Sequence, residues 1–511
     1  MKNAKKYTLL IILVYFGLYL AMGLSLLLKQ PFGNPPDEYN RYLIPQYIAQ
    51  HGTLPNGYEE SIRISGYGFS YAFQPILPYM LQGYVMRFAM LFTESEEILL
   101  YVARGVDLVL GLLTAGVVLL LSREWFRDRR FGFCFAFLAT FLPQSLFVHT
   151  YVNTDSCCML SIAVMLYGLT RRLKSRFSYR DSLIMAVGII LCALSYYNAY
   201  GYILSCILLF TVSFVSASGG CISFDGKNFL KKGCFISAIV LAGISWWFVR
   251  SAILYDGDFL GLQARSECAA LYASPQFHPD TRVTWQSQGY SMWEMLTKSD
   301  FCTLSVLSFI GIYGAMAITT NIWIYRFYKG LFLVGTVLCA FLRCPLFRKQ
   351  DRSGRRDSLF HIFYHANMIF CILMPVILSL IYSYSTDYQP QGRYLLPSLL
   401  PLCYYTIRGL EKLSGLKAAV PFRGYSHSFG PNNQNSQNNQ NGQSGQSSPI
   451  SQISGIGCTG TAGTSSKMNE VRRSCILTCA AVLFCIAVVA MSALTVYGYA
   501  FPYYEAHPVA P

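Results

Sequence analysis

The sequence predicts an all-α membrane protein that crosses the bilayer many times. Of its 511 residues, 53% are hydrophobic and only 13% are charged, whereas roughly 25% of the residues of a typical soluble protein are charged. Eleven apolar runs approach the roughly 20 residues that a helix needs to cross the hydrocarbon core. The basic residues gather in every second loop between these runs. The composition therefore excludes a disordered chain and argues against an ordinary soluble enzyme.

The first predicted span is the run 7–28, and no small-residue cleavage site follows it, so we interpret it as an uncleaved helix and not as a signal peptide. Two further apolar segments, 75–92 and 302–320, are interpreted as amphipathic helices in the outer leaflet. A span at 302–320 would place the basic residues near position 350 outside, unless 322–342 were re-entrant. The remaining ten predicted spans are 98–121, 131–149, 157–170, 182–198, 201–217, 234–252, 322–342, 359–382, 394–410 and 474–499.

The net charge of +15 results from membrane topology and not from a nucleic-acid ligand. If Lys2, Lys5 and Lys6 are cytoplasmic, the loops predicted to lie inside hold 28 of the 40 basic residues and eight of the 25 acidic ones. The positive-inside rule therefore predicts a cytoplasmic N-terminus and, with an odd number of spans, an outer C-terminus. The 17 cysteines lie mostly in apolar runs and show neither metal-ligand spacing nor a disulfide framework.

Three parts are predicted along the chain. Residues 1–410 form the transmembrane module, with large outer loops at 29–97, 253–321 and 383–393. Residues 411–473 form a cytoplasmic linker rich in Asn, Gln, Ser and Gly, which cannot bury enough apolar surface to fold. Residues 474–511 provide the last span and a short outer tail.

The motif Pro35-Pro36-Asp37-Glu38 places two carboxylates just after the first span. A carboxylate that is positioned and partly shielded from water can accept a proton from an attacking hydroxyl. The same residues also fit the start of a helix, with prolines before it and acids in its first turn.

A second charged motif occupies the late outer loop, where the sequence reads Gln389-Pro390-Gln391-Gly392-Arg393-Tyr394. The loop is short, so Arg393 is expected at the outer membrane surface. A guanidinium there suits bidentate contact with a phosphate. An interfacial arginine that meets bulk lipid headgroups is the alternative.

Further polar residues at outer boundaries have structural as well as functional interpretations. Arg104 and Asp107 are three positions apart in a predicted span and can pair, as a structural ion pair or at a functional site. Asn153 and Asp155 are candidates for substrate contact, or they cap the following helix. Other motifs have weaker signals: a kinked segment at Gln74-Pro75, an aromatic belt at Tyr196-Tyr197-Asn198, and a weak cation site at Tyr255-Asp256-Gly257-Asp258.

Six of these segments, taken in order over residues 7–410, resemble a bacterial integral-membrane family, domain of unknown function 2142. That family is similar to the GT-C glycosyltransferases, including the protein O-mannosyltransferases and the lipid A aminoarabinose transferases. Asn40 and Arg41 stand where the family often has His, and Ile76 and Pro78 replace a Pro and a Tyr. The matching segments are Pro36-Asp37-Glu38, Gln74-Pro75, Asn153-Thr154-Asp155, Tyr255–Gly261, Ser308-Phe309-Ile310-Gly311 and Gln391-Gly392-Arg393-Tyr394-Leu395-Leu396-Pro397.

The resemblance implies a GT-C-like bundle in the bacterial cell membrane that transfers a sugar from a polyprenyl-phosphate donor, with inversion, on the extracytoplasmic face. The acceptor would be a cell-envelope glycan, lipid or protein, with no nucleic acid involved. Asp37 would act as the base, and Glu38 would orient it or bind a sugar hydroxyl. No cofactor is expected, and a divalent cation is left open. The implied substrate contacts are Arg393, Asn153, Asp155, Gln74, Tyr394, Gln391 and Arg104.

Other classes of membrane protein also fit this sequence. One is a lipid or polysaccharide transporter or flippase, for which charged or broken helices would be expected at mid-membrane. Another is a polysaccharide ligase or polymerase, which takes a diphosphate-linked oligosaccharide. A third is a non-catalytic partner in envelope assembly. The polar motifs collect at the outer boundary, which favours chemistry at the membrane surface.

Overall fold

The computed structural model describes residues 2–175, 177–218, 221–342, 355–414 and 462–507. The described chain is almost wholly helical, and its one sheet is the hairpin of β1 (Val215–Ser218) and β2 (Cys221–Phe224). Most of the predicted linker, 415–461, lies outside the described residues. The helices are α1 (Lys2–Lys29), α2 (Glu38–His51), α3 (Leu77–Ala89), α4 (Glu96–Trp125), α5 (Arg129–Thr140), α6 (Pro143–Phe147), α7 (Asp155–Ser175), α8 (Tyr179–Ala193), α9 (Tyr200–Val212), α10 (Gly226–Leu254), α11 (Leu262–Tyr272), α12 (Met292–Lys298), α13 (Phe301–Gly311), α14 (Ile322–Phe341), α15 (Arg355–Ser385), α16 (Leu399–Leu413), α17 (Ala462–Thr495) and α18 (Phe501–Ala506).

Six helices of the described chain are long and apolar enough to cross a membrane, so the predicted count of eleven is not confirmed. They lie at Lys6–Lys29, Glu96–Trp125, Gly226–Leu254, Ile322–Phe341, Phe360–Ser385 and Ser474–Ala506. The predicted run 131–149 breaks into α5 and α6 at Pro143, which takes a position in the first turn of α6. Helices α8, α9 and α16 have 13 to 15 residues, which is fewer than the roughly 20 that a perpendicular span needs.

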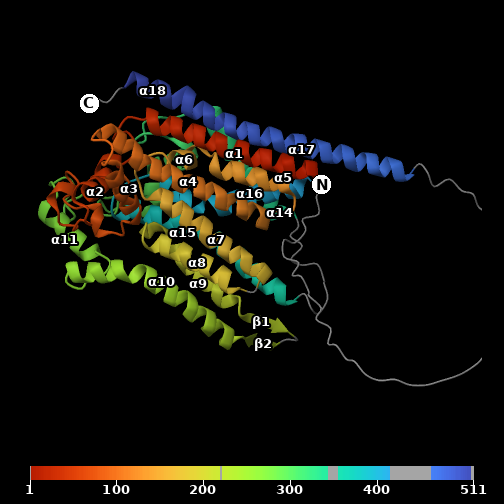
Figure 1. Cartoon of the computed structure of the whole chain (residues 1–511), viewed down its shortest axis with the longest axis horizontal. Helices are drawn as coiled ribbons and strands as arrows, with labels where there is room; N and C mark the ends of the chain where they lie inside the picture. Colours follow the sequence, from red (N-terminus) through yellow and green to blue (C-terminus); the bar gives the residue numbers. More distant parts are fainter. Residues whose placement is uncertain (1, 176, 219–220, 343–354, 415–461, 508–511) are drawn as a thin grey trace, which may run out of the picture.

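The first and last helices run in the same direction along one side of the bundle (Figure 1). The Tyr497 hydroxyl donates to Ser25 Oγ at 3.2 Å, and Lys29 pairs with Glu505 at 3.3 Å. The chain therefore starts at one end of the bundle and finishes at the other. The assignment of these ends to the two sides of a membrane stays the prediction made from charge.

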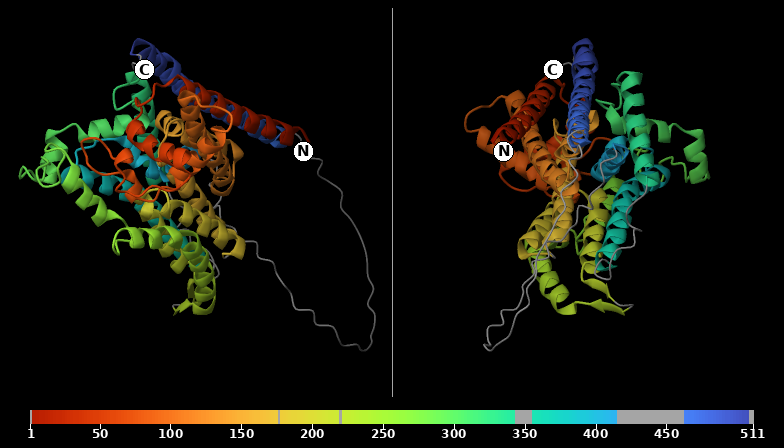
Figure 2. Two further views of the ribbon diagram at one scale, coloured as in Figure 1. Left: turned by 60° about the vertical axis from the view of Figure 1, so that its left-hand side comes forward. Right: turned by 90° about the vertical axis from the view of Figure 1, so that its right-hand side faces the viewer.

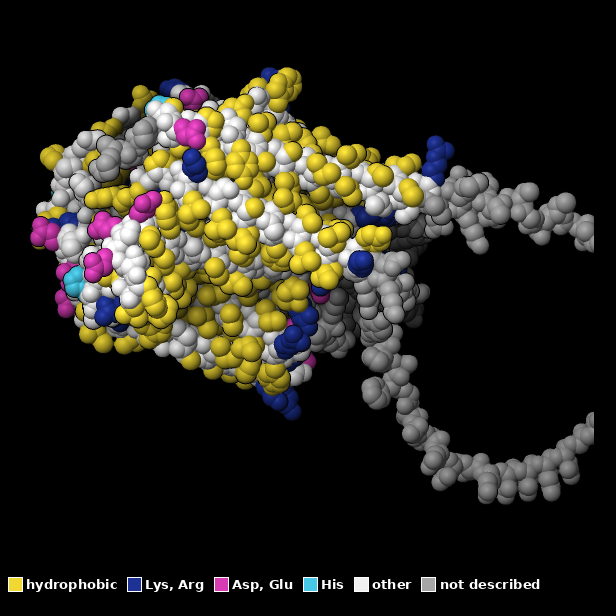
Figure 3. Space-filling model, turned by 45° about the horizontal axis from the view of Figure 1, so that its top comes forward, with side chains coloured by type: hydrophobic (Ala, Val, Ile, Leu, Met, Phe, Trp, Pro, Cys, Tyr) yellow, Lys and Arg dark blue, Asp and Glu magenta, His cyan; other side chains and the backbone are white. Residues whose placement is uncertain are grey.

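The surface separates into an apolar flank and more polar ends. Apolar side chains cover most of the visible flank, while Asp and Glu side chains gather at the end that carries α2, α3 and α11 (Figure 3). Helix α10 packs against α8 at the edge of the bundle, and few of its residues are buried (Figures 1 and 2). This distribution suits a protein surrounded by lipid between its ends.

The two segments interpreted as amphipathic outer helices form short helices. In the first, α3 packs Gly83 against Ile48 of α2, while Phe88 on its other face is 64% exposed. In the second, α13 ends at Gly311 and the chain turns back through a bridge between Tyr313 and Ile318. An 11-residue helix is about 16 Å long, so the segment 302–320 does not cross the bundle as one helix.

Candidate active site

Asp37 stands at the start of α2 but does not cap it. It occupies the N-cap position in the left-handed conformation, with φ 61° and ψ 7°, and its side chain makes no capping hydrogen bond. Aspartate tolerates this conformation better than most residues, although it is uncommon outside glycine. The backbone of Asp37 therefore begins the helix, as one of the two interpretations of the sequence predicted, but its carboxylate accepts no hydrogen bond from the backbone of the first turn of α2.

Two arginines hold this carboxylate. Asp37 Oδ2 accepts a hydrogen bond from Arg393 Nη2 and lies 3.7 Å from Arg41 Nη2. Both arginine side chains are almost fully buried, whereas that of Asp37 is 36% exposed. Burial alone would raise the pKa of Asp37, but the charges of Arg393 and Arg41 outweigh it and lower the pKa below its ordinary value. The carboxylate is therefore ionised at neutral pH, and its Oδ1 accepts no hydrogen bond from the described residues.

Arg393 is fixed by the loop around it. The amide of Gly392 donates to Ser308 Oγ at 2.6 Å, which joins two of the motifs singled out in the sequence. A Cβ on Gly392 would lie 1.9 Å from the amide nitrogen of Phe309, so only glycine permits this approach to α13. Arg393 Nη1 also donates to the carbonyl of Pro36 at 3.3 Å. These contacts tie the late outer loop to the Asp37 loop.

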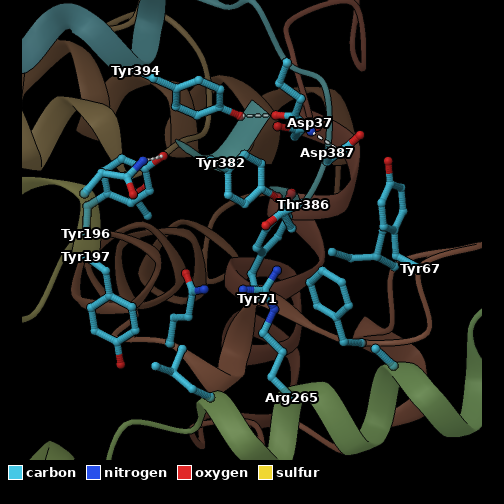
Figure 4. A pocket seen from close by; sticks show the side chains of 18 of the residues that line it. Asp37, Tyr67, Tyr71, Tyr196, Tyr197, Arg265, Tyr382, Thr386, Asp387 and Tyr394 are labelled. Atoms are coloured by element: carbon cyan, nitrogen blue, oxygen red, sulfur yellow. Dashed lines mark hydrogen bonds between the residues drawn. The ribbon is translucent and has the colours of Figure 1, made fainter. Parts of the chain in front are cut away.

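A hydrogen-bonded chain continues from Arg393 to a second carboxylate. Arg393 Nη2 donates to the Tyr394 hydroxyl at 3.1 Å, and that hydroxyl donates to Gln389 Oε1. Gln389 Nε2 in turn donates to Asp387 Oδ2 at 2.7 Å. Tyr394, Asp37 and Asp387 lie along one side of the site in Figure 4. The loop thus binds Asp37 through the charged Arg393 and Asp387 through the neutral amide of Gln389.

Asp37 opens into a cavity of about 590 Å³ at this end of the bundle. The cavity lies between the start of α2, the loop before α3, the residues after α8, one face of α11, and the end of α15 with its following loop. Tyrosines from three of these segments line it (Figure 4). The charged and aromatic lining residues are Asp37, Arg41, Tyr67, Phe69, Tyr71, Tyr79, Tyr196, Tyr197, Arg265, Arg282, Tyr382, Asp387 and Tyr394.

Glu38, the neighbour of Asp37, does not line the cavity. Its side chain is fully buried and pairs with Arg104 through two hydrogen bonds of 2.8 and 2.7 Å. It also accepts from the amides of Val152 and Gly33, both at 3.2 Å. These contacts tie the start of α2 to α4, and neither Glu38 nor Arg104 lines the cavity.

The expected pairing of Arg104 with Asp107 is replaced by other contacts. Arg104 pairs with Glu38 and also donates to the carbonyls of Leu27 and Gln30 at 2.9 Å. Asp107 accepts from Gln82 Nε2 at 2.7 Å. The two residues share a helix face, but their side-chain partners come from two different helices, Glu38 from α2 and Gln82 from α3, which sequence spacing alone does not reveal.

Of the other residues predicted to contact substrate, some line the cavity and others lie outside it. Gln74 and Tyr394 line the cavity, whereas Gln391 does not. Asn153 is buried and caps α7, with its Oδ1 accepting from the amide of Ser156 at 3.0 Å. Asp155 lies behind the cavity, 3.9 Å from Arg41 Nη1. The guanidinium of Arg41 therefore lies between the carboxylates of Asp155 and Asp37.

The sequence interpretation missed several cavity residues. Tyr196 and Tyr197 belong to the cavity wall and not only to an aromatic belt, and Arg265, Arg282 and Asp387 carried no motif signal. Asp258, which the sequence suggested for a cation, accepts from the amide of Ala264 at 3.0 Å and so caps α11. Among the described residues, no group of three or more His, Cys, Asp or Glu side chains is arranged to hold a metal ion.

No family model and no curated protein matches this sequence. Several solved structures resemble it in part. The oligosaccharyltransferase of Archaeoglobus fulgidus, tethered to an acceptor peptide with the NVT sequon, has a TM-score of 0.46 and 14% identity over 79% of this chain and 50% of that one. AglB from the same organism, in complex with an inhibitory peptide and a dolichol-phosphate, has a TM-score of 0.44 and 15% identity over 78% and 50%. ArnT from Cupriavidus metallidurans has a TM-score of 0.32 and 12% identity over 81% and 79%.

The chain spans about half the length of the archaeal oligosaccharyltransferase that it matches. Because these TM-scores lie below 0.5, the GT-C-like architecture and the membership of family 2142 stay predictions. Any function inferred for this chain therefore rests on the residues of the site itself.

Proposed function

We propose that this protein is a membrane glycosyltransferase that moves a sugar from a polyprenyl-phosphate donor to a hydroxyl of a cell-envelope acceptor. The observation that carries the proposal is Asp37. It is a partly exposed carboxylate held by two buried arginines at the wall of an aromatic cavity. We place this cavity on the extracytoplasmic face of a bacterial plasma membrane, as the charge distribution predicts.

The size and lining of the cavity support a sugar ligand. Its volume of about 590 Å³ falls within the roughly 300–1,000 Å³ that is usual for small-molecule sites. Tyrosine rings offer apolar faces to the C–H face of a sugar. The hydroxyls of Tyr67, Tyr71 and Tyr382 make no hydrogen bond within the described chain and can bond the polar edge of the sugar. Gln74 and Asn198 add amide groups that can bond sugar hydroxyls.

Asp37 acts as the general base, which is the one catalytic group that the transfer requires from the protein. The acceptor hydroxyl gives its proton to Asp37 Oδ1 while its oxygen bonds to the anomeric carbon. The bond from that carbon to the phosphate oxygen breaks, and polyprenyl phosphate leaves with both bonding electrons. A phosphate leaves without being protonated by an acid, so a second catalytic carboxyl is not required, in contrast to a glycosidase. The anomeric configuration inverts because the attacking and leaving oxygens lie on opposite faces of the sugar.

The two arginines keep the base in place. Both bind Oδ2, which leaves Oδ1 for the acceptor. The lowered pKa of Asp37 keeps it ionised, and it accepts the proton late, once the attacking hydroxyl has become acidic through bonding to carbon. Arg41 also places a positive charge between the carboxylates of Asp37 and Asp155, at the position where a divalent cation would otherwise bind.

A donor panel tests this proposal. Purified full-length protein in nanodiscs is incubated with radiolabelled polyprenyl-phosphate sugars and envelope-derived acceptors, and the sugar released from lipid is counted. We expect release from at least one donor, with inverted configuration in the product. Movement of an intact labelled lipid across the bilayer without release of its sugar would instead show a flippase.

A further inference from the structure

A second wall of the cavity carries positive charges that do not contact the proposed base, Asp37. Helix α11 lines the cavity with Leu262, Arg265, Ser266 and Ala269, which follow the spacing of one helix face. Arg282, from the loop after α11, joins the same lining. In the view of Figure 4, Arg265 rises from α11 on the side opposite Asp37 and Tyr394.

Arg265 has no anionic partner among the described residues. Its guanidinium lies over the ring of Phe69, 4.1 Å from the ring centre, and no carboxylate of the described chain lies within ion-pair distance. Tyr71, Tyr196 and Tyr382 also lie close enough to Arg265 to interact with its charge. Burial lowers the pKa of Arg265, and the nearby charge of Arg282 acts in the same direction. This pair of cations is therefore an unfavourable arrangement that an anion would relieve.

Arg393 and Arg41 are already committed elsewhere. Arg393 donates to Asp37, to Tyr394 and to the carbonyl of Pro36, and its side chain is only 2% exposed. Arg41 lies between Asp37 and Asp155, with its Nη1 donating to Thr154 Oγ1 at 3.3 Å. A phosphate that bound Arg393 Nη2 would compete with the carboxylate that acts as the base.

The position of Arg393 is also unsuitable for the reaction. In an inverting displacement the leaving phosphate and the base lie on opposite faces of the sugar. Arg393 is hydrogen-bonded to the base itself, so a phosphate there would share its side. Arg265 occupies the opposite wall, with the tyrosines between the two (Figure 4).

We propose that Arg265 and Arg282 form the anion subsite of the cavity and bind a phosphate group. A guanidinium matches a phosphate with two parallel hydrogen bonds, and two guanidiniums suit its charge. The identification of this anion as the phosphate of a lipid-linked donor rests on the proposed function. The expectation that Arg393 clamps the phosphate is thereby replaced by a role in holding the base.

Binding of farnesyl monophosphate to the full-length protein in detergent tests the subsite without requiring turnover. The matched control is Arg63→Gln, because Arg63 also stacks on an aromatic ring, that of Tyr272, but does not line the cavity. We expect the wild type and Arg63→Gln to bind alike, and Arg265→Gln and Arg282→Gln to bind about tenfold or more weakly. Arg265→Lys keeps the charge and should recover part of the binding, which separates loss of the ligand contact from misfolding.

Two further probes identify the source of the phosphate. If inorganic phosphate competes with farnesyl monophosphate in the wild type and loses affinity in Arg265→Gln, the subsite recognises the phosphate alone. If only farnesyl monophosphate binds, and farnesol does not, the subsite recognises a lipid phosphate. Equal binding by wild type, Arg265→Gln and Arg282→Gln, or no binding of either phosphate to the wild type, would overturn the assignment. Binding that depends on Arg265 without transfer from any donor would leave the subsite standing and remove the proposed function.

Discussion

Asp37 and Arg393 are 356 positions apart in the sequence, yet they form a hydrogen-bonded ion pair at the wall of the cavity. The pair joins the loop after α1 to the loop after α15, and so closes the cavity end of the bundle around one carboxylate. The consequences of this contact, and of those that support it, can be measured.

Loss of Arg393 should remove both the orientation and the low pKa of the base. In Arg393→Gln the pKa of Asp37 rises toward its ordinary value, because the largest neighbouring positive charge is gone. We expect transfer to fall by about a hundredfold and stability to fall by about 1–2 kcal/mol, since Asp37 is partly exposed. Sugar release and thermal unfolding measure the two effects, with the exposed Arg326→Gln as control. An Arg393→Gln protein that turns over normally would show that the base needs no clamp.

Glu38 should matter for stability more than for chemistry. Its pair with Arg104 is fully buried, and leaving one member unpaired costs roughly 3–5 kcal/mol. We expect Glu38→Gln to lower the melting temperature strongly, and the double variant Glu38→Gln with Arg104→Gln to recover part of the loss. Thermal unfolding in detergent measures this. A Glu38→Gln protein that melts like the wild type but transfers no sugar would assign Glu38 to the chemistry instead.

The pH dependence follows from the lowered pKa of Asp37. A carboxylate with a lowered folded-state pKa contributes stability above its ordinary value of 3.8, and this contribution is lost as the pH falls through the folded-state pKa. The transfer rate should therefore stay level from neutral pH down to about pH 5. In Arg41→Gln, which removes one of the two cations, the acid limb of the pH–rate profile should move to higher pH. An unchanged acid limb would exclude Asp37 as the group that limits the rate in acid.

Gly392 should tolerate no side chain. A Cβ there would lie 1.9 Å from the amide nitrogen of Phe309, and that backbone has little room to move. Gly392→Ala should displace Arg393 and lower transfer, while the protein still inserts into the membrane. Activity per inserted molecule is the measurement, and Gly330→Ala is the control because no atom lies within 4 Å of its added Cβ. Normal activity in Gly392→Ala would mean that the loop position is not critical.

The sequence predicted the long apolar helices better than the short ones. The run 98–121, which forms most of α4, is long and almost entirely apolar despite Arg104 and Asp107, and its length marks it as a span. Pro143 ends a run that looked continuous, because a proline is compatible with the first turn of a helix but not with its interior. The shorter helices depend on packing against neighbours, which a single sequence does not display.

The site was predictable only where residues lie close to a motif. Asp37 and Arg393 both belong to short motifs at the outer boundary, but nothing local showed that they meet. Glu38 adjoins Asp37 in sequence, yet the left-handed backbone at Asp37 sends the two carboxylates to different surroundings. Arg265 and Arg282 are single arginines in a polar outer segment, and only the fold brings them to the cavity.

Comparison of Asp37→Asn with Asp256→Asn tests whether Asp37 is the base of the transfer. Asp256 is exposed, lies in the loop after α10 and does not line the cavity, so its variant controls for the loss of one carboxylate. With polyprenyl-phosphate sugar as donor, we predict that Asp37→Asn lowers the transfer rate by about 10²- to 10⁴-fold, while Asp256→Asn transfers like the wild type. Equal transfer by Asp37→Asn and the wild type would show that Asp37 is not the base.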